Sequence, residues 1–165
     1  MQWLIDGYNV IRRDADLHGR ETQSLESGRT ALLALLARLA ARVSDNFTVV
    51  FDGARRSGGA PSAGRVRTIF SRPPETADDA LRRLATTLRE GAIVVSSDRA
   101  VQNSARRAGA VAVSAEAFVE AAIGPAENGD DSDDDAAARP QGGPSHRPSR
   151  EARDAARVLR RLRER

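Results

Sequence analysis

The sequence predicts a three-layer α/β domain in which helices cover both faces of a mostly parallel sheet. Short apolar segments with the character of strands alternate with helical segments along residues 1–124. The segments VVF (49–51) and IVV (93–95) are apolar throughout, which is typical of strands buried on both sides. With 165 residues, 40% of them hydrophobic, the chain is long enough to build one core.

The predicted elements follow one another at regular intervals. Ser24, Thr76 and Ser114 are suitable N-caps for three of the helices, and Gly91 ends the second helix. A Gly-rich loop occupies residues 53–64. The predicted strands are 2–5, 47–51, 65–70, 92–96 and 110–113, and the predicted helices are 25–43, 77–90, 99–108 and 115–123.

The composition changes near Gly124, which predicts three parts. Residues 1–124 form the folded domain, and residues 125–149 are an acidic Pro/Gly-rich linker with too few apolar residues to fold. Residues 150–165 form an Arg-rich helix with a thin apolar stripe of Ala152, Ala155, Val158, Leu159 and Leu162. This helix is a candidate to bind nucleic acid first, or else a partner protein or an acidic membrane surface. Alternatively, it packs on the acidic linker or stays a solvated charged helix.

The composition also limits the chemistry. The chain has no cysteine and only two histidines, so disulfides, thiolate sites and His-rich zinc sites are not expected. A metal ion would have oxygen ligands, which favours Mg²⁺ or Mn²⁺. No signal peptide is recognisable at the start, and no apolar stretch approaches the roughly 20 residues that span a bilayer. These features predict a cytoplasmic protein.

Three predicted strands are followed by an aspartate: Asp6, Asp52 and Asp98. In an open parallel sheet the carboxyl ends of the strands meet at one edge, where ligands bind. Carboxylates brought together there repel one another, and a divalent cation would neutralise them. The alternative is structural, because Asp-Gly is a common turn at Asp6 and Asp52, and Asp98 is placed to cap a helix.

A fourth carboxylate comes from the segment ETADD (75–79). At about 100° per residue, Asp78 lies at the border of the apolar face of its helix, whereas Asp79 lies nearly opposite that face. Asp78 is therefore the candidate ligand, and Asp79 is a solvated acid of the first helical turn in a capping box with Thr76. Asn9 is a candidate to orient a phosphate or a metal-bound water, or is an ordinary turn residue. Ser96 and Ser97 can donate hydrogen bonds to a carboxylate or phosphate.

Four motifs resemble those of a known family: IDGYNVI (5–11), VVFDG (49–53), ETADD (75–79) and VVSSD (94–98). In this order and spacing they resemble the YacP-like branch of the NYN domain family, within the PIN/FLAP nuclease-like superfamily, over residues 1–123. The resemblance implies a PIN-like fold and a metal-dependent ribonuclease that cuts as an endoribonuclease, with a bacterial branch of the family associated with mRNA decay at the ribosome. The acidic linker and Arg-rich tail depart from the helical C-terminal extension that the family often has.

The resemblance implies functional residues as well. Asp6, Asn9, Asp78 and Asp98 fall on the acidic and polar positions of the family motifs, and acids also occur at the position of Asp52 in related domains. One or two Mg²⁺ or Mn²⁺ ions would be held by Asp6, Asp78 and Asp98, with Asp52 as a further or indirect ligand. Such an ion lowers the pKa of a bound water and stabilises charge on the phosphate.

An acidic site needs basic residues around it to bind RNA. All 26 strongly basic residues are arginines, which either reflects a GC-rich genome or favours bidentate phosphate contacts. Binding is expected to be electrostatic and weakly sequence-specific, with Tyr8 as the candidate for base stacking. The arginines predicted to surround the site are Arg12, Arg13, Arg55, Arg56, Arg65, Arg67 and Arg99.

Two other functions compete with the nuclease. One is an NYN fold that binds RNA or a protein without cutting. The other is an aspartate-based phosphatase, which usually needs a second carboxylate two residues after the first; Tyr8 occupies that position. The hydrolytic hypothesis fails if Asp6, Asp78 and Asp98 lie too far apart to share an ion.

Overall fold

A five-stranded parallel sheet forms the centre of the molecule. The computed structural model describes residues 1–53, 64–124 and 149–163. The strand order is β3-β2-β1-β4-β5, and each neighbouring pair is parallel. The predicted strands are therefore confirmed; their bounds are β1 (Gln2–Asp6), β2 (Asn46–Phe51), β3 (Val66–Phe70), β4 (Ala92–Val95) and β5 (Val111–Val113).

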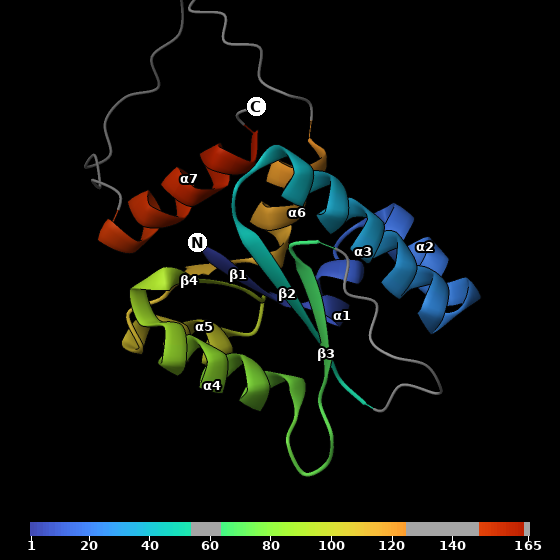
Figure 1. Cartoon of the computed structure of the whole chain (residues 1–165), viewed down its shortest axis with the longest axis horizontal. Coiled ribbons are helices and arrows are strands. Elements are labelled where there is room, and N and C mark those ends of the chain that lie inside the picture. The colour runs from blue at the N-terminus through green and yellow to red at the C-terminus, as the bar shows by residue number, and fades with distance from the viewer. Residues whose placement is uncertain (54–63, 125–148, 164–165) are drawn as a thin grey trace, which may run out of the picture.

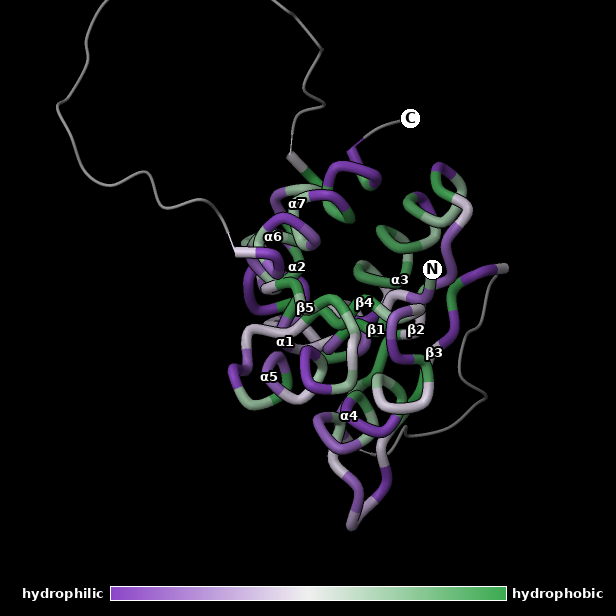
Figure 2. Tube along the Cα trace, turned by 90° about the vertical axis from the view of Figure 1, so that its left-hand side faces the viewer, coloured by the Kyte–Doolittle hydropathy of each residue, from purple (hydrophilic) through white to green (hydrophobic). Residues whose placement is uncertain are grey.

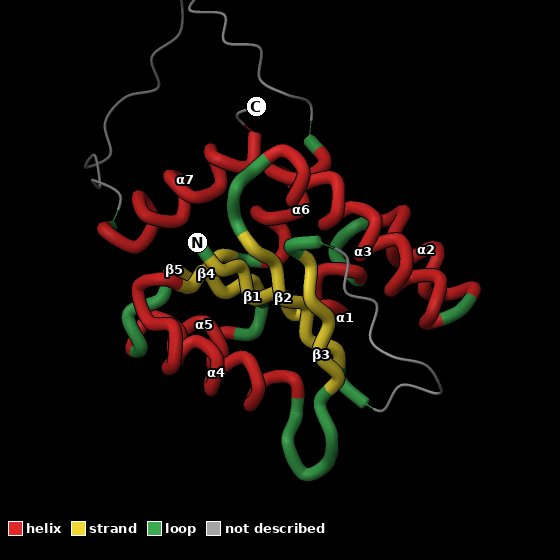
Figure 3. The backbone as a smooth tube through the Cα atoms, in the orientation of Figure 1, coloured by secondary structure: helices red, strands yellow, loops and turns green. Residues whose placement is uncertain are grey.

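Helices cover both faces of this sheet, so the predicted three layers are confirmed (Figure 1 and Figure 3). The helices α4 (Ala77–Leu88) and α5 (Arg99–Arg107) lie on one face. On the other face are α1 (Gly7–Ile11), α3 (Leu25–Arg42), α6 (Ala115–Ile123) and α7 (Arg150–Arg163). The helix α2 (Ala15–Gln23) packs on α3, and a 3-10 turn (Arg89–Gly91) follows α4. No helix in the described ranges is both long and apolar enough for a bilayer span.

The short helices α1 and α2 were not predicted. The apolar signal of α2 is weak, because Leu17 is its one buried residue. Both helices begin at an aspartate cap: the Asp6 side chain accepts from the amide of Asn9, and the Asp14 side chain accepts from the amide of Leu17. The predicted caps Ser24, Thr76 and Ser114 are confirmed.

The two faces of the sheet contribute to separate hydrophobic clusters. Along β1, Trp3 and Ile5 belong to the cluster with α3 and α6, whereas Leu4 belongs to the cluster with α4 and α5. This alternation follows from the two-residue period of a strand, and burial on both sides explains the continuous apolar run. Figure 2 shows hydrophobic strands at the centre and hydrophilic turns on the outer sides of α4 and α5.

The C-terminal helix α7 is confirmed as a helix, but most of its apolar stripe packs against the domain, with Ala152 exposed. Val158 and Leu162 are 2% and 0% exposed in the same cluster as Trp3 and Phe118. The helix contacts α6 and β5 (Figure 1). The stripe thus packs on the domain, and neither on the acidic linker nor free in solvent. Binding of nucleic acid by the exposed arginines of α7 stays a prediction. All of the predicted disordered linker 125–149 except its last residue lies outside the described residues.

Asp45 ties α7 to the start of the sheet. This carboxylate is 2% exposed and accepts from the N-terminal ammonium at 2.7 Å, the Trp3 indole at 3.1 Å and the Arg161 guanidinium at 3.0 Å. Burial alone would raise the pKa of Asp45, but these hydrogen bonds and the two positive charges outweigh burial and lower it.

Asp45→Asn is expected to lower the free energy of unfolding by about 1–3 kcal/mol at pH 7, because it leaves buried donors without a charged acceptor. A lowered folded-state pKa stabilises the fold above the unfolded pKa, near pH 4, and this stabilisation is lost as the pH falls through the folded value. Urea denaturation of both proteins from pH 7 to pH 3 measures the difference. A difference that does not shrink toward pH 3 would contradict the assignment.

Candidate active site

The strand order places the candidate site at the junction of β1 and β4. These strands are neighbours, although the chain visits β2 and β3 between them, so the order reverses here. In open α/β sheets ligands bind beyond the carboxyl ends of the strands at such a point. Asp6 is the last residue of β1, and Asp98 lies just after β4. Asp78, in the first turn of α4, reaches the same edge.

Asp6 is held in place by Asn9 and Ser96. Its Oδ1 accepts from the Asn9 amide at 3.2 Å. Its Oδ2 accepts from Asn9 Nδ2 at 3.0 Å and from Ser96 Oγ at 3.1 Å. Asp6 is 7% exposed and Ser96 is fully buried. The predicted hydrogen bond from Ser96 to a carboxylate is thus present, and Asn9 orients this carboxylate.

Asp98 has a structural contact on one of its two oxygens. Its Oδ1 caps α5 by accepting from the amides of Ala100 at 2.7 Å and Val101 at 2.9 Å. Its own amide donates to Ser96 Oγ at 3.1 Å, so Ser96 joins Asp6 to Asp98. The predicted helix cap is therefore real. The Oδ2 atom accepts no hydrogen bond from the described part of the chain and stays available to a ligand.

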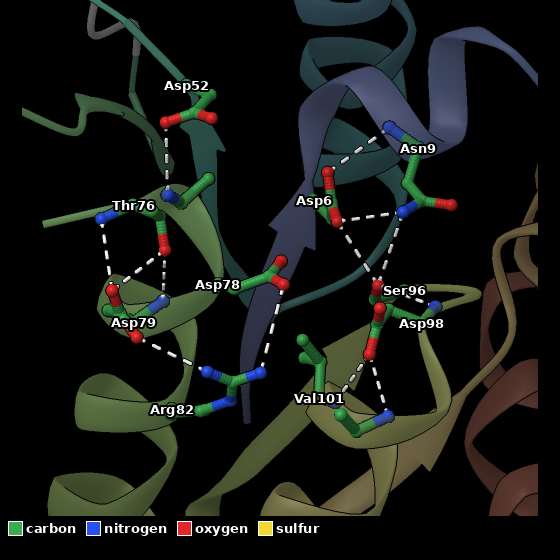
Figure 4. Close-up of polar contacts among 12 residues, drawn as sticks. Asp6, Asn9, Asp52, Thr76, Asp78, Asp79, Arg82, Ser96, Asp98 and Val101 are labelled. Carbon is green, nitrogen blue, oxygen red and sulfur yellow. Dashed lines mark hydrogen bonds and ion pairs between the residues drawn. The ribbon is translucent and has the colours of Figure 1, made fainter.

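Asp78 points toward the space between Asp6 and Asp98 (Figure 4). It is half-buried, with Arg82 Nη2 3.8 Å from its Oδ2. Burial raises the pKa of Asp78, and the negative charges of Asp6 and Asp98 raise it further, against the opposing charge of Arg82. The three carboxylates therefore act electrostatically on one another at this edge.

Asp79 and Asp52 face away from that space (Figure 4). Asp79 forms the predicted capping box with Thr76, and the hydrogen bonds from Thr76 lower the pKa of Asp79. Asp52 Oδ1 accepts from Ser71 Oγ at 2.6 Å and from the Ala77 amide at 3.3 Å, so it ties β2 to the start of α4. Because β2 lies one strand away from the β1–β4 junction, ligation of a metal ion by Asp52 stays a prediction.

The donor set at this edge suits a hard cation. Within the described part of the chain, however, no three His, Asp or Glu side chains are grouped as ligands of one ion. Direct binding of one ion by all three carboxylates therefore stays a prediction. Mg²⁺ is usually held by one or two carboxylates, with water and substrate phosphate completing its shell. The mutually repelling carboxylates of Asp6, Asp78 and Asp98 fit such an open site.

The predicted arginines divide into those near this edge and those far from it. Arg12 follows α1, and Arg99 begins α5 directly after Asp98; both are exposed. Arg13 Nε lies 2.9 Å from Glu116 Oε1, so this charge is already paired. The pKa of Glu116 is lowered, first by the hydrogen bond from Ser97 Oγ and then by a backbone hydrogen bond and the charge of Arg13.

Two of the predicted arginines lie toward the opposite edge, which corrects their placement. Arg65 precedes β3 and donates to the Val43 carbonyl at 2.8 Å, just before β2. Arg67 is the second residue of β3 and is paired in register with Thr48 of β2. Residues that precede or begin parallel strands lie at the amino edge of the sheet. Arg55 and Arg56 lie outside the described residues.

Arg29 of α3 is a residue near this edge that the sequence reasoning missed. Its guanidinium donates from Nε to the Tyr8 hydroxyl at 2.9 Å and also from Nη2. The Tyr8 ring also lies 5.7 Å from the Arg12 guanidinium and packs edge-on against Phe51. These contacts count against Tyr8 as a free base-stacking platform. The sequence did contain a sign of this role, because Arg29 is a charged residue on the apolar face of α3, at helical spacing from Leu32, Leu33 and Leu36.

Gly7 allows this packing. A Cβ atom at Gly7 would lie 2.2 Å from Cε1 of Phe51, far closer than atoms can approach. The glycine between Asp6 and Tyr8 therefore lets the Phe51 ring pack directly on α1. This is the physical reason for glycine in the IDGYN motif, which holds Asn9 one turn from Asp6.

Comparison with known proteins agrees with this architecture. The family model of the YacP-like NYN domain matches residues 3–160, including most of α7. A relative named "Uncharacterized protein YacP" from Bacillus subtilis (strain 168) is 32% identical over 87 residues, which are 52% of this chain and 51% of the relative. The chain thus spans about half the length of that curated relative.

Two solved structures are similar over a larger part. The crystal structure of Rae1 (YacP) from Bacillus subtilis has a TM-score of 0.64 and 29% identity, covering 74% of this chain and 73% of that one. A mutant of the same protein gives a TM-score of 0.62 and 28% identity, covering 74% of both chains. The similarity confirms the predicted PIN-like arrangement of the sheet and its helices.

Proposed function

Because the chain belongs to the YacP-like NYN domain family, whose domain is nuclease-like, we propose that it is a metal-dependent ribonuclease that hydrolyses phosphodiester bonds of RNA. The observation that carries this proposal is the convergence of Asp6, Asp78 and Asp98 at the reversal point of the sheet (Figure 4). The three residues come from β1, α4 and the start of α5, so the tertiary fold brings them together.

Each polar residue at this edge has a distinct task in the proposal. Asp6, Asp78 and Asp98 would hold Mg²⁺ or Mn²⁺, one or two of them directly and the rest through water. When bound, the ion supplies an activated water and stabilises charge on the phosphate. Asn9 and Ser96 fix the orientation of the Asp6 carboxylate by three hydrogen bonds. Because the Asp6 carboxylate is already oriented, no further ordering of this ligand is needed when the substrate binds.

Arg12 and Arg99 support the assignment to RNA. Both are exposed at the carboxyl edge, where their charge offsets the repulsion between the acidic site and the RNA backbone. Endonucleolytic cutting, action on mRNA at the ribosome and a cytoplasmic location are finer parts of the same proposal. They rest on the family resemblance, and mapping of RNA ends with and without ribosomes tests the first two.

Removal of the metal is the direct test. The chain, incubated with 5′-labelled RNA and Mn²⁺ or Mg²⁺, is expected to cleave it; an excess of chelator abolishes cleavage, and added Mn²⁺ restores it. The measurement is the rate of product formation on a denaturing gel. If RNA binds equally with and without metal and is never cut, the chain is an RNA-binding module and the nuclease proposal is wrong.

A further inference from the structure

Arg29 lies on a ledge of aromatic side chains at the carboxyl edge of the sheet. Its guanidinium carbon is 5.4 Å from the ring centre of Tyr8, 5.5 Å from that of Phe51 and 5.2 Å from that of Phe70. Phe51 and Phe70 are the last residues of β2 and β3. Tyr8 belongs to α1, between Asp6 and Asn9. The charge is therefore held at the carboxyl edge of the sheet, and Tyr8 links it to Asp6 two residues earlier in the chain.

This guanidinium has hydrogen-bonding capacity to spare. Arginine has five N–H donors, and the contacts of Arg29 with described residues direct only Nε and Nη2 to the Tyr8 hydroxyl. It forms no ion pair with an acid of the described ranges. Among the described residues, no atom of Arg29 is both buried and without a hydrogen-bond partner. The remaining donors of Arg29 therefore reach solvent.

The aromatic ledge also restricts the side chain. The guanidinium contacts three rings and one hydroxyl, and these contacts reduce the conformational entropy that is lost when a ligand binds. A planar, preoriented guanidinium that lacks a carboxylate suits a phosphate oxygen. Phosphodiester groups recur along the substrate of the proposed nuclease.

We propose that Arg29, on the ledge formed by Tyr8, Phe51 and Phe70, binds a backbone phosphate of the nucleic acid and positions the strand beside Asp6, Asp78 and Asp98. The inference rests on the proposed function for the identity of its ligand as RNA. Arg12 lies 5.7 Å from the same Tyr8 ring and adds a second positive charge. Glu21 partly offsets that charge, 3.7 Å from Arg12 Nε, so Arg29 is the better phosphate ligand.

The alternative is that Arg29 merely stabilises the aromatic ledge. A structural role would lower the melting temperature of a variant but leave the salt dependence of RNA binding unchanged. A phosphate contact, in contrast, adds about 0.7 to the slope of log affinity against log salt for a single strand. The slope therefore separates the two roles.

Arg29→Met removes the charge and keeps an unbranched apolar side chain on the three rings. Binding of a fluorescent single-stranded RNA to the full chain is measured from 50 to 300 mM salt with chelator present, so that no cleavage occurs. The variant is expected to bind about fivefold more weakly near 0.1 M salt, with a slope shallower by about 0.7. Single-stranded DNA should lose the same factor, because phosphate is the shared ligand.

Arg38→Met is the matched control. Arg38 is exposed on the same helix α3, nine residues further and thus on the opposite side of the helix. Its slope and affinity should equal those of the unaltered chain. If Arg29→Met is too unstable to measure, Arg29→Gln removes the same charge and has the same expected slope.

The outcomes distinguish the two proposals. An unchanged slope and affinity in a folded Arg29→Met or Arg29→Gln variant overturns the phosphate contact, whether or not the chain cuts RNA. The expected loss of slope in a chain that never cuts RNA with Mn²⁺ supports the contact and rejects the nuclease.

Discussion

Asp78→Asn is expected to slow RNA cleavage by more than about 100-fold, because loss of even a supporting contact around metal ligands costs about 10- to 100-fold. The substitution removes a negative charge from the space that Asp6 and Asp98 also face. It should leave RNA binding unchanged or slightly stronger, since one repulsive charge is gone. The measurement is the cleavage rate with saturating Mn²⁺, together with the affinity in chelator.

Asp79→Asn is the matched control for this prediction. Asp79 is adjacent in the sequence and has the same charge, but its carboxylate bonds to Thr76 and Arg82 on the outer side of α4. The control should cleave at nearly the rate of the unaltered chain. Equal losses in both variants would indicate that the position of α4, and not a ligand at Asp78, is what cleavage requires.

Leu162→Ala is expected to lower the free energy of unfolding by about 2–5 kcal/mol, the usual cost of a cavity left by a buried leucine. Leu162 is fully buried, in the cluster that contains Trp3 and Phe118. Its helix follows the acidic segment 125–149, so the result reports whether α7 is part of the folding unit. Thermal and urea denaturation of the full chain measure the change.

Arg160→Ala is the control on the same helix. Arg160 is exposed, so its removal should change the stability by no more than about 0.5 kcal/mol. If Leu162→Ala is equally mild and the unfolding transition is unaltered, α7 is not docked on the domain in solution. The domain would then end near Gly124, as the composition of the chain suggests.

Much of the fold could be read from local patterns. The burial of strands and the difference between Asp78 and Asp79 depend on periods of two or 3.6 residues. The caps at Ser24, Thr76 and Ser114 depend on hydrogen bonds to amides of the next turn. Those periods operate within one element, so they are visible in a single sequence. The short helix α2 was not predicted, because a helix with one buried residue has almost no hydrophobic period to detect.

The order of the strands in the sheet decided which of the candidate site residues lie together. Asp6, Asp52 and Asp98 look equivalent in the sequence, since each follows a strand. The tertiary structure separates them, because β4 pairs with β1 and places Asp98 beside Asp6, while Asp52 joins β2 to α4. The parallel pairing of β3 with β2 leaves Arg65, which precedes β3, at the amino edge of the sheet. Long-range packing buries Leu162 and brings Arg29 to the Tyr8 ring. Contacts between segments distant in the chain have no local period, so the sequence determined the elements and their chemistry, whereas the packing of those elements decided which side chains meet.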